Sequence, residues 1–268
     1  APDIPIVQPE LQNAHRQLGP LGGGNPFIEI PADEQGQVWV MLHSGSRNFG
    51  YKIAKHYNAL AQTLCTAFHP VVCPFNGQAG LALLPNGSVW ATEYITAMNY
   101  ALDFALESRL AMMRQVLKVM CIEYCDCGEP VHIHHNYAAL EHHFGKNVWI
   151  HRKGATSARK DQMGIIPGSM GTASYIVKGL GNAQSFMSCS HGAGRTMGRK
   201  EASRKLAVED CDKAMAGIVY GRWGTDRKGN IDLGEAPGAY KDIEHVMESQ
   251  ADLVEIVTKL RPLAVIKG

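Results

Sequence analysis

The run Val38-Trp39-Val40-Met41-Leu42 is apolar throughout and has the length of one β-strand. It ends at His43, the first residue of the small-residue turn His43-Ser44-Gly45-Ser46-Arg47. Loops that a rigid scaffold positions in this way often contain the binding residues of a protein. The pattern predicts a buried strand over residues 38–42 with a ligand-binding turn at its end, although a single histidine in such a place is more often structural.

The remaining pattern along the chain mixes helices and strands. Residues 27–30 and 148–151 are expected to be strands, and residues 10–17 and 51–63 helices. The clearest helix covers residues 93–120, where apolar side chains recur at spacings of three and four. A second long helix is expected over residues 241–260, ended by Pro262 and followed by a short strand over 263–266. We therefore expect an α+β domain with strands that end in ligand-bearing turns and two long peripheral helices.

The composition fits an ordinary globular protein. The 268 residues are 45% hydrophobic and 19% charged, and a formal net charge of +1 neither indicates nor excludes nucleic acid, since a basic groove can lie within a neutral total. No apolar run reaches the roughly 18 residues of a membrane span, so no membrane partner is expected. The seven cysteines are an odd number without a CxxC pair, which predicts reduced thiols and a cytoplasmic location.

The run Ser190-His191-Gly192-Ala193-Gly194-Arg195 predicts nucleophilic chemistry at phosphorus. A histidine among small residues can approach a bulky ligand and hold a phosphoryl or nucleotidyl group covalently. The guanidinium of Arg195 could then bind phosphate oxygens in a bidentate fork. The alternative is a loop histidine beside a glycine turn.

Three further runs point to ligand binding, each with a simpler alternative. In His132-Ile133-His134-His135-Asn136, an extended backbone would put His132 and His134 on one face and His135 on the other, either as metal ligands or as a solvated cluster. The cations and hydroxyls of residues 152–158 suit phosphate, or are ordinary surface charge. Residues 164–174 form a glycine-rich loop that is neither a Walker nor a Rossmann motif. Together these runs indicate metal-assisted phosphorus chemistry on a nucleotide.

The order of the motifs resembles the RtcB family of RNA-splicing ligases, and the resemblance spans essentially the whole chain. The matching runs are Leu21-Gly22-Gly23-Gly24-Asn25, Phe27-Ile28-Glu29, His43-Ser44-Gly45-Ser46-Arg47, His134-His135-Asn136-Tyr137, Arg152-Lys153-Gly154-Ala155, Pro167-Gly168-Ser169-Met170-Gly171, Ser190-His191-Gly192-Ala193-Gly194-Arg195, Ala239-Tyr240-Lys241-Asp242 and Lys267-Gly268. The resemblance implies a single RtcB-type domain over residues 1–268.

The resemblance also implies an activity. The family uses GTP and Mn²⁺ to join an RNA end with a 2′,3′-cyclic phosphate or 3′-phosphate to a 5′-hydroxyl end, in tRNA splicing and RNA repair. By resemblance, His191 is the nucleophile that takes up GMP, the guanylate then passes to the RNA 3′-phosphate, and the 5′-hydroxyl displaces GMP. An archease-type activating partner is also an expectation.

The resemblance assigns roles to individual residues. His43 and His135 are the expected Mn²⁺ ligands, and Asn25, Lys153 and Arg195 are expected around the phosphates. The residues expected around guanine are Glu29, Ser174, Tyr240 and Lys267. The other expected nucleotide-binding residues are Pro167, Ser169, Met170, Gly192, Ala193 and Gly194. A locally basic groove built from Arg47, Lys153, Arg195 and Arg199 is expected to bind the RNA in a salt-dependent way.

Two departures from the family pattern leave alternatives open. The N-terminal segment in which the family has a metal-bridging aspartate and cysteine has no match, and the family's Gly-Asn-His-Phe is here Gly24-Asn25-Pro26-Phe27, whose proline cannot bind a metal. We expect an N-terminally truncated chain, either part of a longer protein or a paralogue. Such a paralogue would be catalytically silent and bind GTP or RNA ends without joining them. A histidine-metal phosphatase or nuclease is the third hypothesis.

Overall fold

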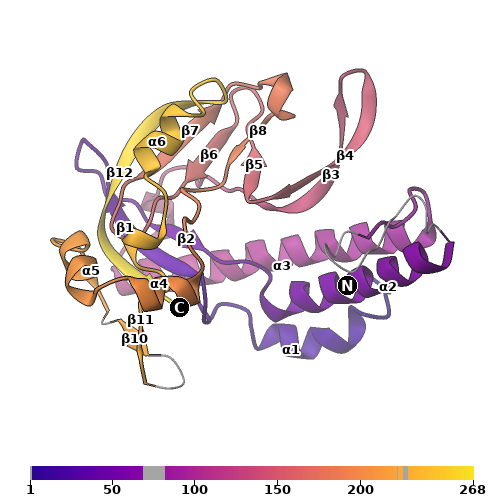
Figure 1. Ribbon diagram of the computed structural model, residues 1–268, viewed down its shortest axis with the longest axis horizontal. Helices are drawn as coiled ribbons and strands as arrows, with labels where there is room; N and C mark the ends of the chain where they lie inside the picture. The colour runs from indigo at the N-terminus through magenta and orange to yellow at the C-terminus, as the bar shows by residue number, and fades with distance from the viewer. Residues whose placement is uncertain (1, 69–81, 222, 226–228) are drawn as a thin grey trace. The chain divides into compact units, whose positions relative to one another are not determined.

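A computed structural model describes residues 2–68, 82–221, 223–225 and 229–268. The chain divides into two compact units, shown in Figure 1. The first consists of Ala1–Leu21 and Ser44–Cys121, and the second of Gly22–His43 and Ile122–Gly268. Helices and strands are mixed, as expected for an α+β protein. The His43-Ser44 bond is one of the points at which the chain passes between the units.

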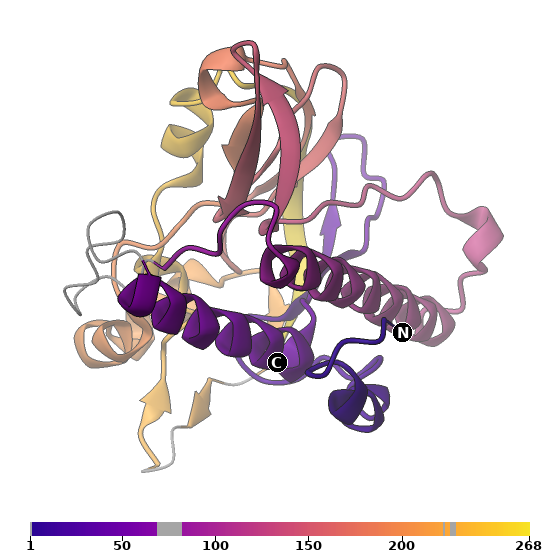
Figure 2. The ribbon, with the colours of Figure 1, turned by 90° about the vertical axis from the view of Figure 1, so that its right-hand side faces the viewer.

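The first unit is helical. A 3₁₀ turn, η1 (Gln8–Glu10), leads into α1 (Leu11–His15), and the long helices α2 (Arg47–Phe68) and α3 (Val89–Val119) follow. Figures 1 and 2 show α2 and α3 side by side. Their contact buries Phe49 and Ile53 of α2 with Ala97 of α3, because the apolar residues repeat at helical spacing along both. The helices expected over residues 51–63 and 93–120 are therefore confirmed, the first with longer ends.

The second unit is built on one strongly curved sheet. Its strand order is β2 (Met41–His43), β1 (Phe27–Ala32), β12 (Val254–Lys267), β7 (Ser174–Gly179) and β6 (Met163–Ile166), all antiparallel, and β9 (Val219–Tyr220) pairs with β12 in parallel. Register shifts lie between Ile30 and Pro31 and between Ile256 and Thr258. Irregularities of this kind increase local twist, which agrees with the sweep of β12 in Figure 1.

Smaller elements surround this sheet. Three two-stranded ribbons are β3 (Asn136–His143) with β4 (Lys146–Lys153), β5 (Ala155–Ser157) with β8 (Ser188–Ser190), and β10 (Gly224–Thr225) with β11 (Ile231–Asp232). The helical elements are η2 (Tyr124–Asp126), η3 (Ala183–Ser185), α4 (Arg199–Lys205), α5 (Val208–Ala214), η4 (Pro237–Ala239) and α6 (Ile243–Glu248). The main core of the unit packs Ile243 and Met247 of α6 against Tyr175 and Val177 of β7.

The long helix expected over residues 241–260 is wrong. Helix α6 ends at Glu248, and β12 begins at Val254. The β-branched residues from Val254 to Thr258 favour a strand, and pairing with both β7 and β1 gives this segment its ladder hydrogen bonds. Pro262 lies within β12, opposite Pro31 at the register shift, where a missing backbone N–H is tolerated. The short strand expected over 263–266 is confirmed as part of β12.

The strand expected over residues 38–42 is only partly present. Strand β2 starts at Met41, and Val38, which makes one isolated bridge to Ala32, is 50% exposed. The indole Nε1 of Trp39 donates to the carboxylate of Asp33 at 3.0 Å, and the Trp39 N–H donates to the backbone oxygen of Pro31 at 2.9 Å. This segment therefore lies beside β1 without forming a regular buried strand.

Two general findings concern the whole described chain. None of the helices in the described ranges combines the length and apolar character needed to cross a membrane. The six cysteines that the structure describes are free thiols, and the seventh, Cys73, lies outside the described residues.

A buried ionic network joins the β3–β4 ribbon to the strand that precedes His191. Arg152 of β4 donates to both carboxylate oxygens of Glu141 on β3, at 2.5 and 3.0 Å, and His143 lies 2.9 Å from the same carboxylate. The Arg152 Nε also donates to the Ser188 hydroxyl of β8 at 2.9 Å. The hydrogen bond from Arg152 lowers the pKa of Glu141 to about 2. The cation expected here to bind phosphate is therefore a structural one.

Candidate functional site

Three histidines from distant parts of the sequence meet in the second unit. His43 ends β2, His135 immediately precedes β3, and His191 immediately follows β8. The ring centroids of His43 and His135 are 5.2 Å apart, and those of His135 and His191 are 5.0 Å apart. The rings of His132 and His134 contact each other at 5.0 Å. The structure thus separates His135 from the other two histidines of its run, as the sequence predicts.

The hydrogen bonds of His43 orient it as a metal ligand would be oriented. Its Nδ1 lies 3.1 Å from the backbone oxygen of Asn25. A carbonyl oxygen only accepts, so Nδ1 carries the proton and Nε2 presents its lone pair. That Nε2 lies 2.9 Å from Nε2 of His135. Among the residues that the structure describes, no group of three His, Cys, Asp or Glu side chains is placed to hold a metal ion, so this pair would supply only part of a coordination shell.

Gly154 places the backbone against the ring of His191. It has φ +76°, and a Cβ built on it would lie 3.6 Å from Cε1 and 3.7 Å from Nδ1 of His191. Its N–H donates to the backbone oxygen of His135 at 3.2 Å, and its neighbour Ala155 pairs with Ser190 across β5 and β8. The exposed Lys153 therefore directly precedes Gly154, which bonds to His135 and lies beside the ring of His191.

A buried carboxylate lies on the sheet beside these loops. Glu29 of β1 is 2% exposed, and the hydroxyl of Ser174 at the start of β7 donates to it at 3.4 Å. Burial raises the pKa of Glu29 to about 8, against the smaller lowering effects of Ser174 and Lys267. Lys267 pairs with Phe27 across β1 and β12, and its Nζ lies 4.9 Å from the centroid of the Phe27 ring. The carboxylate, hydroxyl and ammonium groups expected around guanine thus lie on neighbouring strands.

The loops after β6 and β8 contact each other closely. The N–H of Ala193 donates to the oxygen of Pro167 at 2.9 Å. A Cβ on Gly192 would lie 3.0 Å from the same oxygen, so the approach favours glycine. Ser169 and Met170 are buried in the loop that begins at Pro167. The loop that begins at Pro167 therefore contacts the two residues that follow His191 in the sequence.

Arg195 lies within a cluster of polar side chains. Its Nη1 donates to Glu235 and to the Tyr240 hydroxyl, each at 3.1 Å, and its guanidinium carbon lies 4.8 Å from the Tyr240 ring centroid. The other Nη donates to the backbone oxygen of Gly234. Burial and Glu235 raise the pKa of Tyr240. Of the four cations expected to form an RNA groove, only Arg195 and Arg199 share a partner, Glu235.

The other two cations of that expected groove belong to other elements. Lys153 is at the end of β4. Arg47 belongs to the first unit, where its Nη1 donates to the backbone oxygen of Leu21 at 2.6 Å.

Sequence reasoning missed two carboxylates that organise this region, Glu235 and Glu141. Neither lies in a recognisable motif with its partners, since Glu235 contacts Lys267 across 32 positions and Glu141 contacts Arg152 across 11. The only available signal was the presence of Arg195 and Arg152 among apolar and small residues, where a buried cation needs a counter-charge.

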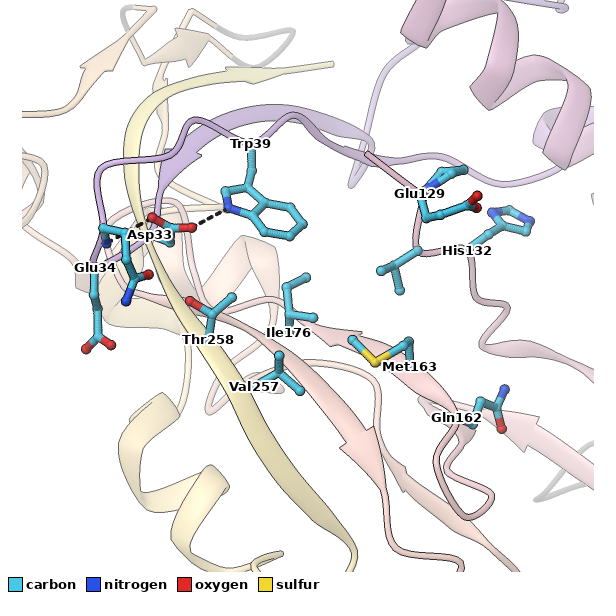
Figure 3. A pocket seen from close by; sticks show the side chains of 13 residues that line it. Asp33, Glu34, Trp39, Glu129, His132, Gln162, Met163, Ile176, Val257 and Thr258 are labelled. Atoms are coloured by element: carbon cyan, nitrogen blue, oxygen red, sulfur yellow. Dashed lines mark hydrogen bonds between the residues drawn. The ribbon is translucent and has the colours of Figure 1, made fainter. Parts of the chain in front are cut away.

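A cavity of about 620 Å³ in the second unit is lined by none of the residues to which the family resemblance assigns a role. Figure 3 shows Trp39, Ile176, Val257 and Met163 around it, with the Asp33–Trp39 hydrogen bond at its edge. Its lining includes three carboxylates and no lysine or arginine, which does not suit phosphate. His132 lines this cavity, whereas His135 lies beside His43 and His191. The two ends of this histidine run therefore lie in different surroundings.

Comparison with known proteins identifies the family. The family model described as tRNA-splicing ligase RtcB matches residues 3–268. The chain is 42% identical over 264 residues to the RNA-splicing ligase RtcB of Escherichia coli K12, which covers 96% of this chain and 62% of that protein. It is 33% identical over 297 residues to the tRNA-splicing ligase RtcB of Pyrobaculum aerophilum, with 94% and 60% covered. The RNA-splicing ligase RtcB of Mycobacterium bovis is 32% identical over 299 residues, with 96% and 66% covered.

The chain thus spans a little under two thirds of the length of these relatives, and almost all of it takes part in the match. The match includes the loops that bring His43, His135 and His191 together. The chain belongs to the RtcB family, the tRNA-splicing ligases.

Proposed function

We propose that this chain contributes the guanylylation centre of a GTP- and Mn²⁺-dependent RNA ligase. Its substrates would be an RNA end with a 3′-phosphate or 2′,3′-cyclic phosphate and an RNA end with a 5′-hydroxyl. The observation that supports this most directly is the row of three imidazoles formed by His43, His135 and His191. This row places a candidate nucleophile beside a candidate metal-binding pair.

The surroundings of His191 suit a nucleophile. The Nδ1–Cε1 edge of its ring faces Gly154, so Nε2 is the nitrogen left to react. Attack of Nε2 on the α-phosphorus of GTP would form a P–N bond and break the P–O bond to pyrophosphate, which leaves. The exposed Lys153 would offset charge on the phosphates. An oxygen of the RNA 3′-phosphate would then take the GMP group from His191, and the 5′-hydroxyl oxygen would displace GMP with loss of its proton.

The carboxylate of Glu29 suits recognition of guanine. Guanine presents neighbouring N–H donors at N1 and N2, and a carboxylate with two acceptor oxygens matches that edge. Ser174 and Lys267 lie near enough to influence Glu29 electrostatically. Adenine has no donor at N1, so this pair of acceptors would discriminate against ATP.

The donor set also fits a divalent ion in part. His43 and His135 would hold it through Nε2, with the remaining ligands drawn from phosphate oxygens or other groups. When bound, Mn²⁺ would offset the negative charge that develops on the phosphates.

The test is to incubate the chain with GTP and Mn²⁺ and to measure its intact mass. A gain of one GMP, absent from His191→Ala, is the expected result. His142→Ala removes an exposed histidine from the end of β3, away from the row, and is the matched control. An adduct that persists in His191→Ala would refute the nucleophile assignment. Folded protein without an adduct would favour a silent binding protein, and phosphate release or RNA cleavage without an adduct would favour a phosphatase or nuclease.

A further inference from the structure

Glu235 is the acceptor at the centre of the polar cluster around Arg195. It lies between β11 and η4, and its side chain is 15% exposed. One carboxylate oxygen accepts from Arg195 Nη1 at 3.1 Å and from Arg199 Nε at 2.7 Å. The other accepts from the Tyr240 hydroxyl at 2.5 Å and from Lys267 Nζ at 3.1 Å. Four donors thus share two oxygens of one side chain.

These donors come from separate segments of the chain. Arg195 follows β8, Tyr240 follows η4, and Lys267 ends β12. Arg195 and Tyr240 are also joined by an isolated backbone bridge. Three cations this close would repel one another without a counter-charge. Burial alone would raise the pKa of Glu235, but Lys267, Tyr240 and Arg199 more than offset this effect and lower it, so the carboxylate is ionised.

We infer that Glu235 is a positioning residue of the nucleotide pocket, which sets Arg195 on the phosphate side relative to Tyr240 and Lys267 on the base side. The inference rests on the proposed function, because that function is what assigns the two sides. Glu235 itself does not contact the nucleotide. Together with the direct contact between Arg195 and Tyr240, it fixes the distance between the groups that do, since each of its two oxygens serves one side of the pocket.

Substitution by glutamine tests this geometry. The amide keeps the size of the side chain but replaces one oxygen by an NH₂ group, which donates and cannot accept. Depending on which way the amide turns, Glu235→Gln therefore loses either the bonds from Arg195 and Arg199 or the bond from Lys267. The Tyr240 hydroxyl can also accept, so it keeps a bond in both cases. Glu235→Asp keeps both oxygens and the charge but withdraws them by one methylene, so it should recover part of the effect.

Glu244 offers a matched control in the same unit. Its carboxylate accepts from the Tyr175 hydroxyl at 2.7 Å and from Lys259 Nζ at 2.6 Å. Glu244→Gln thus removes the same kind of tyrosine and lysine contacts on α6, outside the expected pocket. Any loss of ligand affinity that comes simply from breaking such contacts will therefore also appear in Glu244→Gln.

The experiment is calorimetric titration of each variant with GTP, guanosine and tripolyphosphate in the presence of Mn²⁺, after thermal melting has shown that the variant is folded. Glu235→Gln is expected to weaken GTP binding roughly tenfold or more. Guanosine and tripolyphosphate each contact one side only, so each should lose less than GTP does. A purely structural role would weaken all three ligands alike.

The outcomes separate the inference from the function on which it rests. Wild-type protein that binds no GTP would contradict the proposed function. Wild-type protein that binds GTP, with Glu235→Gln no weaker than Glu244→Gln, would contradict the role of Glu235. If the glutamine variant does not fold, the comparison passes to Glu235→Asp, which is expected to bind GTP several-fold more weakly than Glu244→Gln does. Equal binding by those two variants would also refute the inference.

Discussion

Replacement of Glu29 by glutamine should flatten the pH dependence of stability. Burial raises the pKa of Glu29 from 4.5 to about 8, so the folded protein holds this proton more tightly than the unfolded chain does. Stability linked to this group is then fully present below pH 4.5 and is lost as the pH rises through 8. At about 1.36 kcal/mol per pKa unit, the total is on the order of 5 kcal/mol.

The assay is urea unfolding of wild-type and Glu29→Gln protein between pH 5 and pH 8.5. Between pH 5 and pH 8.5, the free energy of unfolding of the wild-type protein should fall by roughly 4 kcal/mol relative to that of the variant, because the amide of the variant does not titrate. Near pH 5 the two proteins should differ least, since the wild-type carboxyl group is then protonated in the folded state. Glu255→Gln, which removes an exposed carboxylate from β12 of the same sheet, is the matched control.

Parallel stability curves for wild-type and Glu29→Gln would refute the reasoning. They would mean that Glu29 is solvated or paired well enough to ionise in the folded protein as it does in the unfolded chain. If the free energy of unfolding of the wild-type protein rose with pH relative to that of the variant, the predicted effect would have the wrong sign.

Four further outcomes are expected. GTP binding at pH 7 should release close to one proton through ionisation of Glu29, measured by calorimetry in buffers of different ionisation enthalpy; no dependence on the buffer would contradict this. Glu141→Gln should lower the free energy of unfolding at pH 7 by about 3–5 kcal/mol, because Arg152 is left buried without its charge partner, and chemical denaturation would show it. Gly154→Ala should cost about 1 kcal/mol for its positive φ and slow GMP attachment, whereas an unchanged rate of adduct formation would show that the contact with the nucleophile is unimportant. His43→Ala should weaken Mn²⁺ binding roughly tenfold or more in a titration followed by electron paramagnetic resonance, and an unchanged affinity would remove His43 from the metal site.

The sequence predicts best those elements whose signal is long and local. Helix α3 has a helical repeat of apolar residues over 31 positions, and its approximate bounds follow from that repeat alone. The end of the chain was harder because a short helix and a long strand adjoin within residues 241–260, so helical spacing in the first part was extended wrongly into the second. Pairing of β12 with β7 and β1, which no local pattern shows, determines the structure there.

The candidate site likewise contains some residues that the sequence predicts and others that it does not. His43, His135 and His191 each stand in a distinctive run of small or polar residues, and the resemblance to a family assigned all three to one expected site. The side chains that orient the site depend on contacts between distant segments. Glu235 and Glu141 stand in no motif of their own, so their importance becomes visible only when the chain is folded.

The position of β12 in the sheet has a consequence for synthesis of the protein. Phe27 and Lys267 are paired neighbours but lie 240 positions apart in the sequence. The ribosome must therefore complete almost the whole of this sequence before β1 can pair with β12. A nascent chain stopped before Val254 would leave β1 and β7 each without the strand that separates them, with unpaired backbone groups open to other chains. Premature termination in this region would therefore yield a product that is prone to association and lacks the central strand of its sheet.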